Sequence, residues 1–521
     1  MASPNPVAGP ANEIRMVVAA ASAGSFLAFY DFFLFANLAP LIASRFFPDS
    51  TPTAALLLTI ATFATSFVAR PFGALVFGRL GDLTGRKPAF SLSLLIMGVS
   101  TFAIGLVPGF DRIGLAAPAI ILLLRLLQGL ALGGDTGGAM TYTAEASPAA
   151  HRGLSTAWIQ ASALLGLVVS LGAILMTRYA LDPDQAISVE KFNAWGWRIP
   201  FLLSILLVAV SAYIRSKLPE SPAFTRLKPE GILSSSSVPP RSLLPSSTPV
   251  LPPSRLLLTL LGATMGQGVL FCTGTLFALS FLEKTCHIDL DQSKTMLLIA
   301  FVPATPLVLL FGRWSDRIGR KGILLGGMLL AVLSWPFLFH ELPAIPRTEG
   351  RTELTARKEI RSTVSFIGKS RDLTRTTETI SYYADGMQVV ETKEDTVFAN
   401  GRVSANPKST LSSSINTRDY WKIIAILFGI AFSISMVCGP IAALLADFFP
   451  ARIRYTSLSL AYEIGNGIFG GLVPWLAVLL TTAWPGNKEA GLWYPLGITV
   501  ICFVIGALAI PSKGRKFAHV D

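Results

Sequence analysis

Apolar residues fill the chain in runs of roughly 20, and short polar segments separate these runs. A helix needs about 20 apolar residues to cross the ~30 Å of hydrocarbon in a bilayer, so each run predicts a transmembrane helix. A stretch rich in Pro and Ser, 217–255, divides the runs into six and six, and its composition is typical of a linker. The predicted spans are 16–38, 53–78, 88–108, 117–144, 155–178, 197–216, 256–282, 294–312, 322–340, 421–447, 457–482 and 491–511.

Composition agrees with a lipid-facing surface. Hydrophobic residues make up 52% of the chain and charged residues only 14%. A soluble domain covers its core with charged residues amounting to roughly a quarter of its sequence, and here the charge is too sparse for that. We therefore expect an all-α membrane protein with twelve transmembrane helices in two six-helix bundles.

Charge is distributed unevenly between the two sets of loops. The net charge is +12, and most Lys and Arg lie in alternate short loops, which predicts topology rather than nucleic-acid binding. By the positive-inside rule both termini are cytoplasmic, as is the linker 217–255. The long polar segment 341–419 is then extracytoplasmic. Its short alternating runs suggest hairpins, and it fits either a small β-rich cap or a disordered loop.

One loop occurs twice, at the same place in each half. Residues 78–87 read GRLGDLTGRK and residues 312–321 read GRWSDRIGRK, with six of ten positions identical. Two halves with the same topology are the mark of a parallel repeat. Glycines permit a tight turn and close helix approach, and a carboxylate can cap a facing helix N-terminus. The loop residues of interest are Gly78, Asp82, Gly85, Arg86 and Lys87, with Gly312, Asp316, Arg317, Gly319, Arg320 and Lys321.

These loops resemble the signature loop of the major facilitator superfamily. The resemblance implies an N-terminal six-helix bundle over 1–216 and a C-terminal bundle over 256–521 that carries the insert 341–419. It also implies that the loops act as a conformational latch rather than a substrate site. Glu145, with Arg86 or Arg152, would add a salt bridge to this latch.

A closer resemblance, over nearly the whole membrane portion, is to the metabolite:proton symporter family, which includes carriers of citrate, 2-oxoglutarate, shikimate, and proline and betaine. Three positions depart from the family pattern: Phe29 replaces a Trp, Asp135 a Glu, and Glu463 stands where a His is expected. The stretches that match are FYDFF (29–33), RPFG (70–73), RLLQG (125–129), GGDTGG (133–138), WRIPF (197–201), PESP (219–222), RIRYTS (452–457) and GNG (465–467).

Ionisable residues within the spans are the main functional candidates, because each costs at least about 2.5–3.5 kcal/mol on insertion scales. Depth arithmetic at 1.5 Å per residue places Asp31 and Arg125 in the same outer half of the membrane. Related sugar–proton symporters have an Asp and an Arg at matching positions. Our hypothesis is that Asp31 is the proton site and that Arg125 adjusts its proton affinity. A purely structural ion pair is the alternative.

Further polar residues on the same spans are candidates for a substrate cavity. Arg70 and Asp135 lie at similar depth and are expected to form a second pair, for which a structural role is the stronger interpretation. The glycines around Asp135 predict close helix packing rather than a phosphate loop. The candidate cavity residues are Tyr30, Arg70, Gln128, Asp135, Gln160, Gln267, Glu463 and Asn466.

These features favour a secondary transporter that carries a small polar metabolite, a carboxylate or a zwitterion, together with a proton. We see no metal, cofactor or nucleophile constellation that would predict an enzyme, and no ATP-binding loop, so the proton gradient is the expected energy source. An efflux antiporter of the same fold and a transporter-like sensor are the alternatives. We expect a monomer in the plasma membrane, most simply a bacterial inner membrane, without a nucleic-acid partner.

Overall fold

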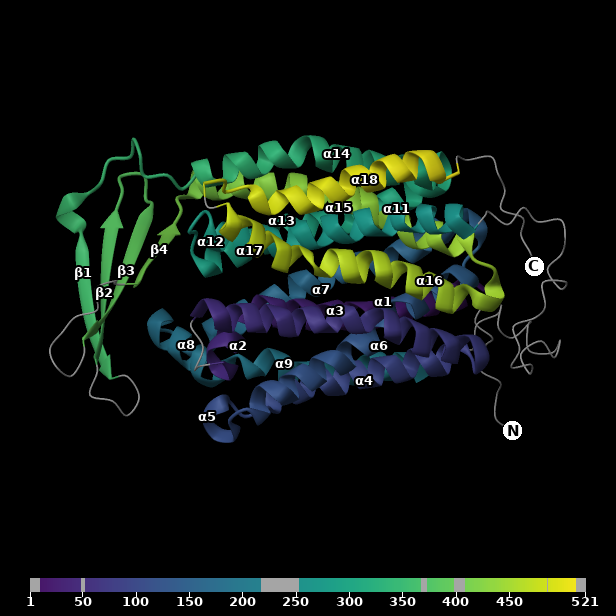
Figure 1. Cartoon of the computed structure of the whole chain (residues 1–521), viewed down its shortest axis with the longest axis horizontal. Coiled ribbons are helices and arrows are strands. Elements are labelled where there is room, and N and C mark those ends of the chain that lie inside the picture. The colour runs from purple at the N-terminus through teal and green to yellow at the C-terminus, as the bar shows by residue number, and fades with distance from the viewer. Residues whose placement is uncertain are drawn as a thin grey trace.

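The computed structural model describes residues 10–47, 52–216, 253–366, 373–397, 408–484 and 486–511. Within this part of the chain, long helices form a bundle with a β-sheet at one end (Figure 1). The predicted linker 217–255 lies outside the described residues up to position 252. We call the end of the bundle that carries the two duplicated loops the latch end, and the opposite end the sheet end.

Six long helices build the first half, and each coincides with a predicted span. Short helices join them at the sheet end: α2 (Ala39–Phe46), α5 (Phe110–Ile113) and α8 (Gln185–Lys191). The long helices are α1 (Pro10–Asn37), α3 (Pro52–Leu83), α4 (Arg86–Leu106), α6 (Ala116–Ala146), α7 (Arg152–Leu181) and α9 (Arg198–Ser216).

The second half repeats this order, but π-helical turns interrupt two of its spans. Such wider turns are frequent at functional sites. One broken span consists of α11 (Pro253–Cys272), the π-turn η4 (Thr273–Phe277) and α12 (Ala278–Lys284). The other consists of α16 (Arg454–Tyr462), the π-segment η8 (Glu463–Gly470) and α17 (Val473–Ala483). The uninterrupted helices are α13 (Leu290–Ile318), α14 (Arg320–Glu341), α15 (Thr417–Phe448) and α18 (Trp493–Ala509).

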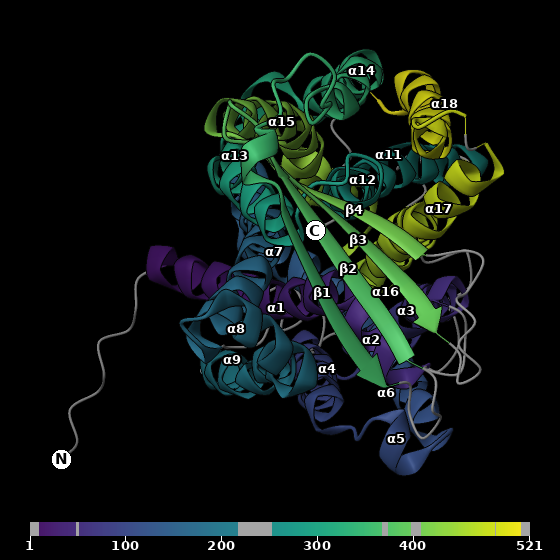
Figure 2. The ribbon, with the colours of Figure 1, turned by 90° about the vertical axis from the view of Figure 1, so that its left-hand side faces the viewer.

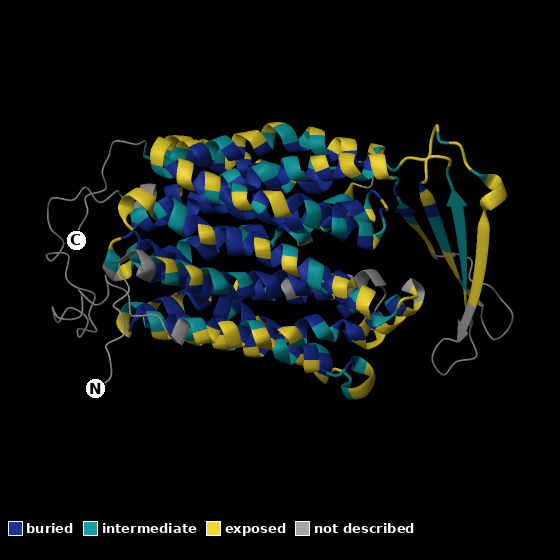
Figure 3. Cartoon of the chain, turned by 180° about the vertical axis from the view of Figure 1, so that it is seen from behind, coloured by how far each residue is buried: buried dark blue, intermediate teal, exposed yellow. Residues whose placement is uncertain are grey.

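Length and hydropathy confirm the membrane fold. In the described residues ten helical stretches are long and apolar enough to cross a bilayer, and the bent pair Ile187–Gly196 with Arg198–Ile214 is an eleventh. The 32-residue α3 packs along α6 and completes the twelve-helix architecture. Large apolar side chains are exposed, such as Phe337 at 73% and Leu508 at 84%, and exposed positions recur along the helices (Figure 3). Lipid is the natural solvent for such a surface.

The chain enters and leaves the bundle at the latch end. Near its start, α1 packs Val17 and Ala20 against Tyr142, which lies toward the latch end of α6. Near the end of α18, the carbonyls of Ala507 and Ile510 accept hydrogen bonds of 2.7 Å from Lys321 of the second duplicated loop. The two ends of the described chain therefore share one side of the bundle, as an even number of spans requires.

Four antiparallel strands form the sheet, in the order β1-β2-β3-β4. Ser, Thr and charged residues occupy both faces, and most described positions of the strands are exposed or half-buried (Figure 3). Of the two interpretations of the insert, the β-rich cap is confirmed and the disordered loop is wrong for these residues. The strands are β1 (Glu359–Phe366), β2 (Leu373–Tyr382), β3 (Gln388–Val397) and β4 (Lys408–Ser414).

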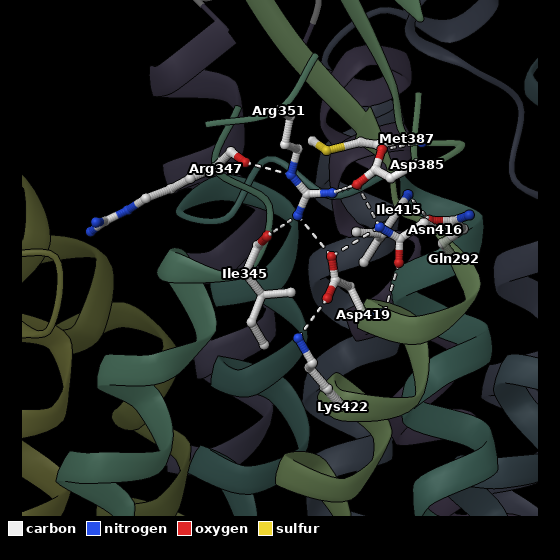
Figure 4. A network of polar contacts seen from close by, with 10 residues as sticks. All are labelled: Gln292, Ile345, Arg347, Arg351, Asp385, Met387, Ile415, Asn416, Asp419 and Lys422. Carbon is white, nitrogen blue, oxygen red and sulfur yellow. Dashed lines mark hydrogen bonds and ion pairs between the residues drawn. The ribbon is translucent and has the colours of Figure 1, made fainter. Parts of the chain in front are cut away.

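The sheet is fastened to the second half. Arg351 forms ion pairs with Asp385, in the turn between β2 and β3, and with Asp419, in the first turn of α15 (Figure 4). Ser413 of β4 also forms a bridge to Ile288, in the loop before α13. Viewed from the sheet end, the strands extend from α13 and α15 across the ends of helices of the first half (Figure 2). The described part of the cap is thus attached to the second half.

Candidate functional site

Asp31 of α1 and Arg125 of α6 form an ion pair inside the first half. Arg125 Nη1 lies 4.0 Å from Asp31 Oδ2, and both side chains are at most 4% exposed. Gln128, one turn after Arg125, donates a 2.7 Å hydrogen bond to the same Asp31 oxygen. The guanidinium of Arg125 also stacks over the Phe35 ring, 3.4 Å from its centroid. The structure thus brings together the two residues that the depth argument paired, while their role in coupling stays a prediction.

Arg70 of α3 has its ion partner in the opposite half. Its Nη1 lies 3.9 Å from Glu463 Oε2 in η8, and both side chains are at most 3% exposed. The expected pair of Arg70 with Asp135 is therefore wrong, although Asp135 is fully buried. Depth along the bundle was similar for Arg70 and Asp135, but the direction in which Arg70 points decided its partner.

The guanidinium of Arg70 is poorly compensated for a buried cation. It stacks on Phe67 at 4.2 Å and Phe32 at 5.2 Å from the ring centroids. Its Nε and Nη2 atoms donate no hydrogen bond to any described residue. Buried guanidinium N–H groups normally find acceptors, so this arginine has donor capacity available for an anion.

The remaining candidate cavity residues contact either their own half or the opposite half. Tyr30 donates its hydroxyl to the Pro200 carbonyl at 2.8 Å, which ties α1 to α9 within the first half. Gln160 lies between the halves and is 3.4 Å from the Tyr462 hydroxyl. Gln267 is 3.5 Å from Cys438 Sγ, and Asn466 is 4% exposed in η8, close to Gly268. Tyr462 was not singled out from the sequence, because a lone span tyrosine is more often simply packed.

The first duplicated loop binds the second half. Asp82 Oδ2 accepts hydrogen bonds from the Thr456 N–H at 3.1 Å and the Thr456 hydroxyl at 2.5 Å, at the start of α16. Arg86 pairs with Asp82 and donates to the Ala451 carbonyl at 2.7 Å. A Cβ on Gly78 would lie 2.7 Å from Thr456 Cα, so this position requires glycine. The backbone of Gly85, at φ 128°, makes the turn.

The second loop repeats this arrangement in the opposite direction. Asp316 accepts hydrogen bonds from the N–H groups of Gly153 at 2.8 Å and Leu154 at 3.0 Å, at the start of α7 in the first half. A carboxylate at a helix N-terminus is favoured by both the unpaired N–H groups and the helix dipole. A Cβ on Gly312 would lie 2.4 Å from the Ala157 Cβ, and Gly319 has φ 105°. Arg317 is exposed.

Ion pairs next to each loop complete the symmetry. Glu145, at the end of α6, lies 3.6 Å from Arg86 and 3.3 Å from Arg454 of the second half. Its predicted link to Arg86 is therefore confirmed. Arg152, the other residue suggested for Glu145, forms its ion pair with Asp447 at 2.8 Å, and Asp447 also pairs with Arg320. Each half thus contributes one carboxylate between an arginine of its own and an arginine of the other half.

Comparisons with known proteins give the same architecture. Residues 16–237 match the family model described as "Sugar (and other) transporter". The inner membrane metabolite transport protein YhjE of Escherichia coli is 28% identical over 505 residues, covering 95% of this chain and 94% of that protein. The citrate-proton symporter of Klebsiella pneumoniae is 26% identical over 500 residues, covering 95% and 93%.

A solved structure of the proton:xylose symporter XylE has a TM-score of 0.64 at 15% identity and covers 96% of this chain and 97% of that one, which establishes the shared fold. The proteins named in these comparisons are transporters rather than enzymes. The long helices and the repeated loop that binds across the halves are consistent with this likeness in fold. The chain thus has the fold of XylE, a protein of the major facilitator superfamily.

Proposed function

We propose that the protein is a proton-coupled symporter of a small metabolite that carries a carboxylate, zwitterions included. The single observation that carries this proposal is the environment of the Arg70 side chain. Arg70 is a buried cation at the boundary between the halves, with two guanidinium nitrogens that bond to no described residue. A carboxylate is the partner that satisfies such a fork of N–H donors. Glu463, beside Arg70, would select a solute with a donor group of its own.

Asp31 is the proposed proton site. Its carboxylate is buried and is compensated by Arg125 at 4.0 Å and by the Gln128 amide. A buried carboxylate stays ionised only while such partners remain in place, so a movement that separates Asp31 from Arg125 favours proton uptake. Arg70 and Arg125 lie on α3 and α6, which pack against each other, and we propose that substrate bound at Arg70 influences the proton site.

Alternating access supplies the transport step. The two loops fasten the halves together at the latch end through Asp82 and Asp316. We propose that this end faces the cytoplasm, because the short loops there are rich in Arg and Lys, and that the sheet is extracytoplasmic. The proton gradient is the energy source in this proposal. Release of the latch while the sheet end closes would change access to the site from one side of the membrane to the other.

Purified protein in proteoliposomes tests the proposal. Labelled citrate, L-proline, glycine betaine and shikimate would be offered with and without an inward proton gradient. We expect at least one solute to accumulate only when the gradient is imposed. The Asp31→Asn variant should lose this accumulation but keep solute exchange across the membrane at zero gradient. Solute binding without flux would instead support the sensor alternative, and accumulation by Asp31→Asn would remove Asp31 as the proton site.

A further inference from the structure

A pocket of about 260 Å³ opens at the sheet end, between the two halves. Its walls come from the end of α1 and the start of α2 in the first half, and from α12 and α17 in the second. Pockets for drug-sized ligands measure roughly 300–1,000 Å³, so this one suits a smaller solute. None of the transport residues described above lines it.

The pocket contains polar groups that lack partners. Asn37, at the end of α1, is 8% exposed, and its Nδ2 atom donates no hydrogen bond to the described residues. Glu283 of α12 lines the same pocket, and its Oε1 atom is likewise buried without a donor in the described part of the chain. Lys284 follows it on the pocket wall. Buried polar atoms without partners are uncommon and each requires an explanation.

The pocket lies on the path toward Asp31. Asn37 follows Asp31 by six residues on α1, which corresponds to roughly 9 Å along the helix axis. Phe33, between these levels, contacts Phe271 of α11 with ring centroids 5.9 Å apart, and Phe29, two residues before Asp31, contacts the same ring at 5.7 Å. The contact of Phe33 with Phe271 thus lies between the levels of Asp31 and the pocket along α1.

We propose that this pocket is an outer binding site for a small zwitterion, occupied before the solute reaches the central site. Asn37 Nδ2 and Lys284 hold the solute carboxylate, and Glu283 Oε1 accepts from its ammonium group. The charged side chains lining the pocket are one carboxylate and one ammonium, adjacent in the chain, which is the complement of a zwitterion. The ammonium group of the buried Lys294 of α13 also acts electrostatically on Glu283. The order of occupation rests on the proposed transport function, whereas binding in the pocket does not.

Protection of an introduced cysteine tests the site directly. Thr481 of α17 lines the pocket, and the four native cysteines are buried and free. The rate at which a charged methanethiosulfonate reagent modifies Thr481→Cys would be measured in nanodiscs with glycine, L-proline, L-glutamate, propionate or choline present. We expect at least one of the three amino acids to slow modification several-fold, and propionate and choline to have much smaller effects.

Matched variants separate this site from the transport proposal. Glu283→Gln and Asn37→Ala, each added to Thr481→Cys, should abolish protection, whereas Asp31→Asn should preserve it even though accumulation is lost. Thr352→Cys, exposed beside the sheet, should show no protection by any solute. Protection that survives Glu283→Gln, or no protection by any of the amino acids, overturns the outer site. Protection without uptake in proteoliposomes would retain the outer site and reject the transport proposal alone.

Discussion

The carboxylate of Asp82 in the first half accepts hydrogen bonds from both the N–H and the hydroxyl of Thr456 in the second half, at 3.1 and 2.5 Å. Hydrogen bonds to charged groups contribute about 1.5–3 kcal/mol each. Asp82→Ala should therefore raise the population of the state open at the latch end by about tenfold or more. Spin labels at the exposed positions Leu83 and Ile318 would report a longer distance distribution. Asp111→Ala, an exposed carboxylate at the sheet end, should leave the distribution unchanged. An unchanged distribution in Asp82→Ala would contradict the latch role.

Arg70 and Glu463 should behave as a coupled pair across the halves. Removing one member of a buried ion pair costs about 3–5 kcal/mol, because the other charge is left uncompensated. With a separation of 3.9 Å and aromatic contacts on Arg70, we expect Glu463→Gln to cost about 3 kcal/mol. The double variant Arg70→Gln, Glu463→Gln should recover most of this loss. Thermal unfolding of the four proteins in detergent measures the coupling, and additive effects would argue against the pair.

Gly133 should be intolerant of a side chain. A Cβ there would lie 2.0 Å from the Arg70 carbonyl oxygen, so Gly133→Ala forces α3 and α6 apart. Overpacking of this kind costs typically about 1–3 kcal/mol. Gly322→Ala is the matched control, because nothing lies within 4 Å of its Cβ and alanine favours the helix. The melting temperature should fall only for Gly133→Ala, together with a raised KM for uptake because Arg70 shifts. Equal melting temperatures would show that the two helices can separate without cost.

The ion pair of Arg351 with Asp385, which helps to attach the sheet to the second half, should weaken in acid. Burial raises the pKa of Asp385, but the Met387 N–H, the Asn416 amide and Arg351 outweigh it and hold the pKa below the usual range. An aspartate whose pKa is lower in the folded state adds stability at neutral pH, and this contribution is lost as the pH falls below about 4. Asp385→Asn should thus reduce hydrogen-exchange protection of β2 and β3 at pH 7, after correction for intrinsic rates.

At pH 3 the difference in protection between the wild type and Asp385→Asn should be smaller than at pH 7, because the stabilisation from the ionised Asp385 is lost as the pH falls through its lowered folded-state pKa. Asp184→Asn, in the first half, serves as the control and should leave the strands unaffected at both pH values. A difference as large at pH 3 as at pH 7 would mean that Asp385 acts through packing rather than through its charge.

The helices could be predicted from the sequence because hydropathy is a local property. The predicted span 421–447 compares with α15 at Thr417–Phe448, for example. The pairing of Asp31 with Arg125 followed from depth alone, since both residues point into the same bundle. Arg70 shows the limit of that method. Its depth was right, but a side chain at the boundary between the halves can turn toward either, and Glu463 lies almost 400 residues away in the chain.

Two other features depended on contacts that a sequence does not display. Thr456 binds Asp82 because α16 begins opposite the first loop, and no local pattern marks that residue. The sequence predicted the sheet only weakly, because its strands are polar on both faces and alternate only over short runs. Asn37 and Glu283 share a pocket only because η4 and α12 bring Glu283 to the end of α1.

Arg351 attaches the cap to α15 of the second half, so the strands should move together with that half. Strand β2 has 10 residues, which corresponds to roughly 33 Å at 3.3 Å per residue. A rigid-body rotation of about 15°, as occurs between subunits of other proteins, would sweep the free tip of such a lever through roughly 9 Å. A small rotation of the second half within the bilayer would therefore become a larger displacement of the strands in water. A dye or an antibody fragment bound to the strands can report that displacement.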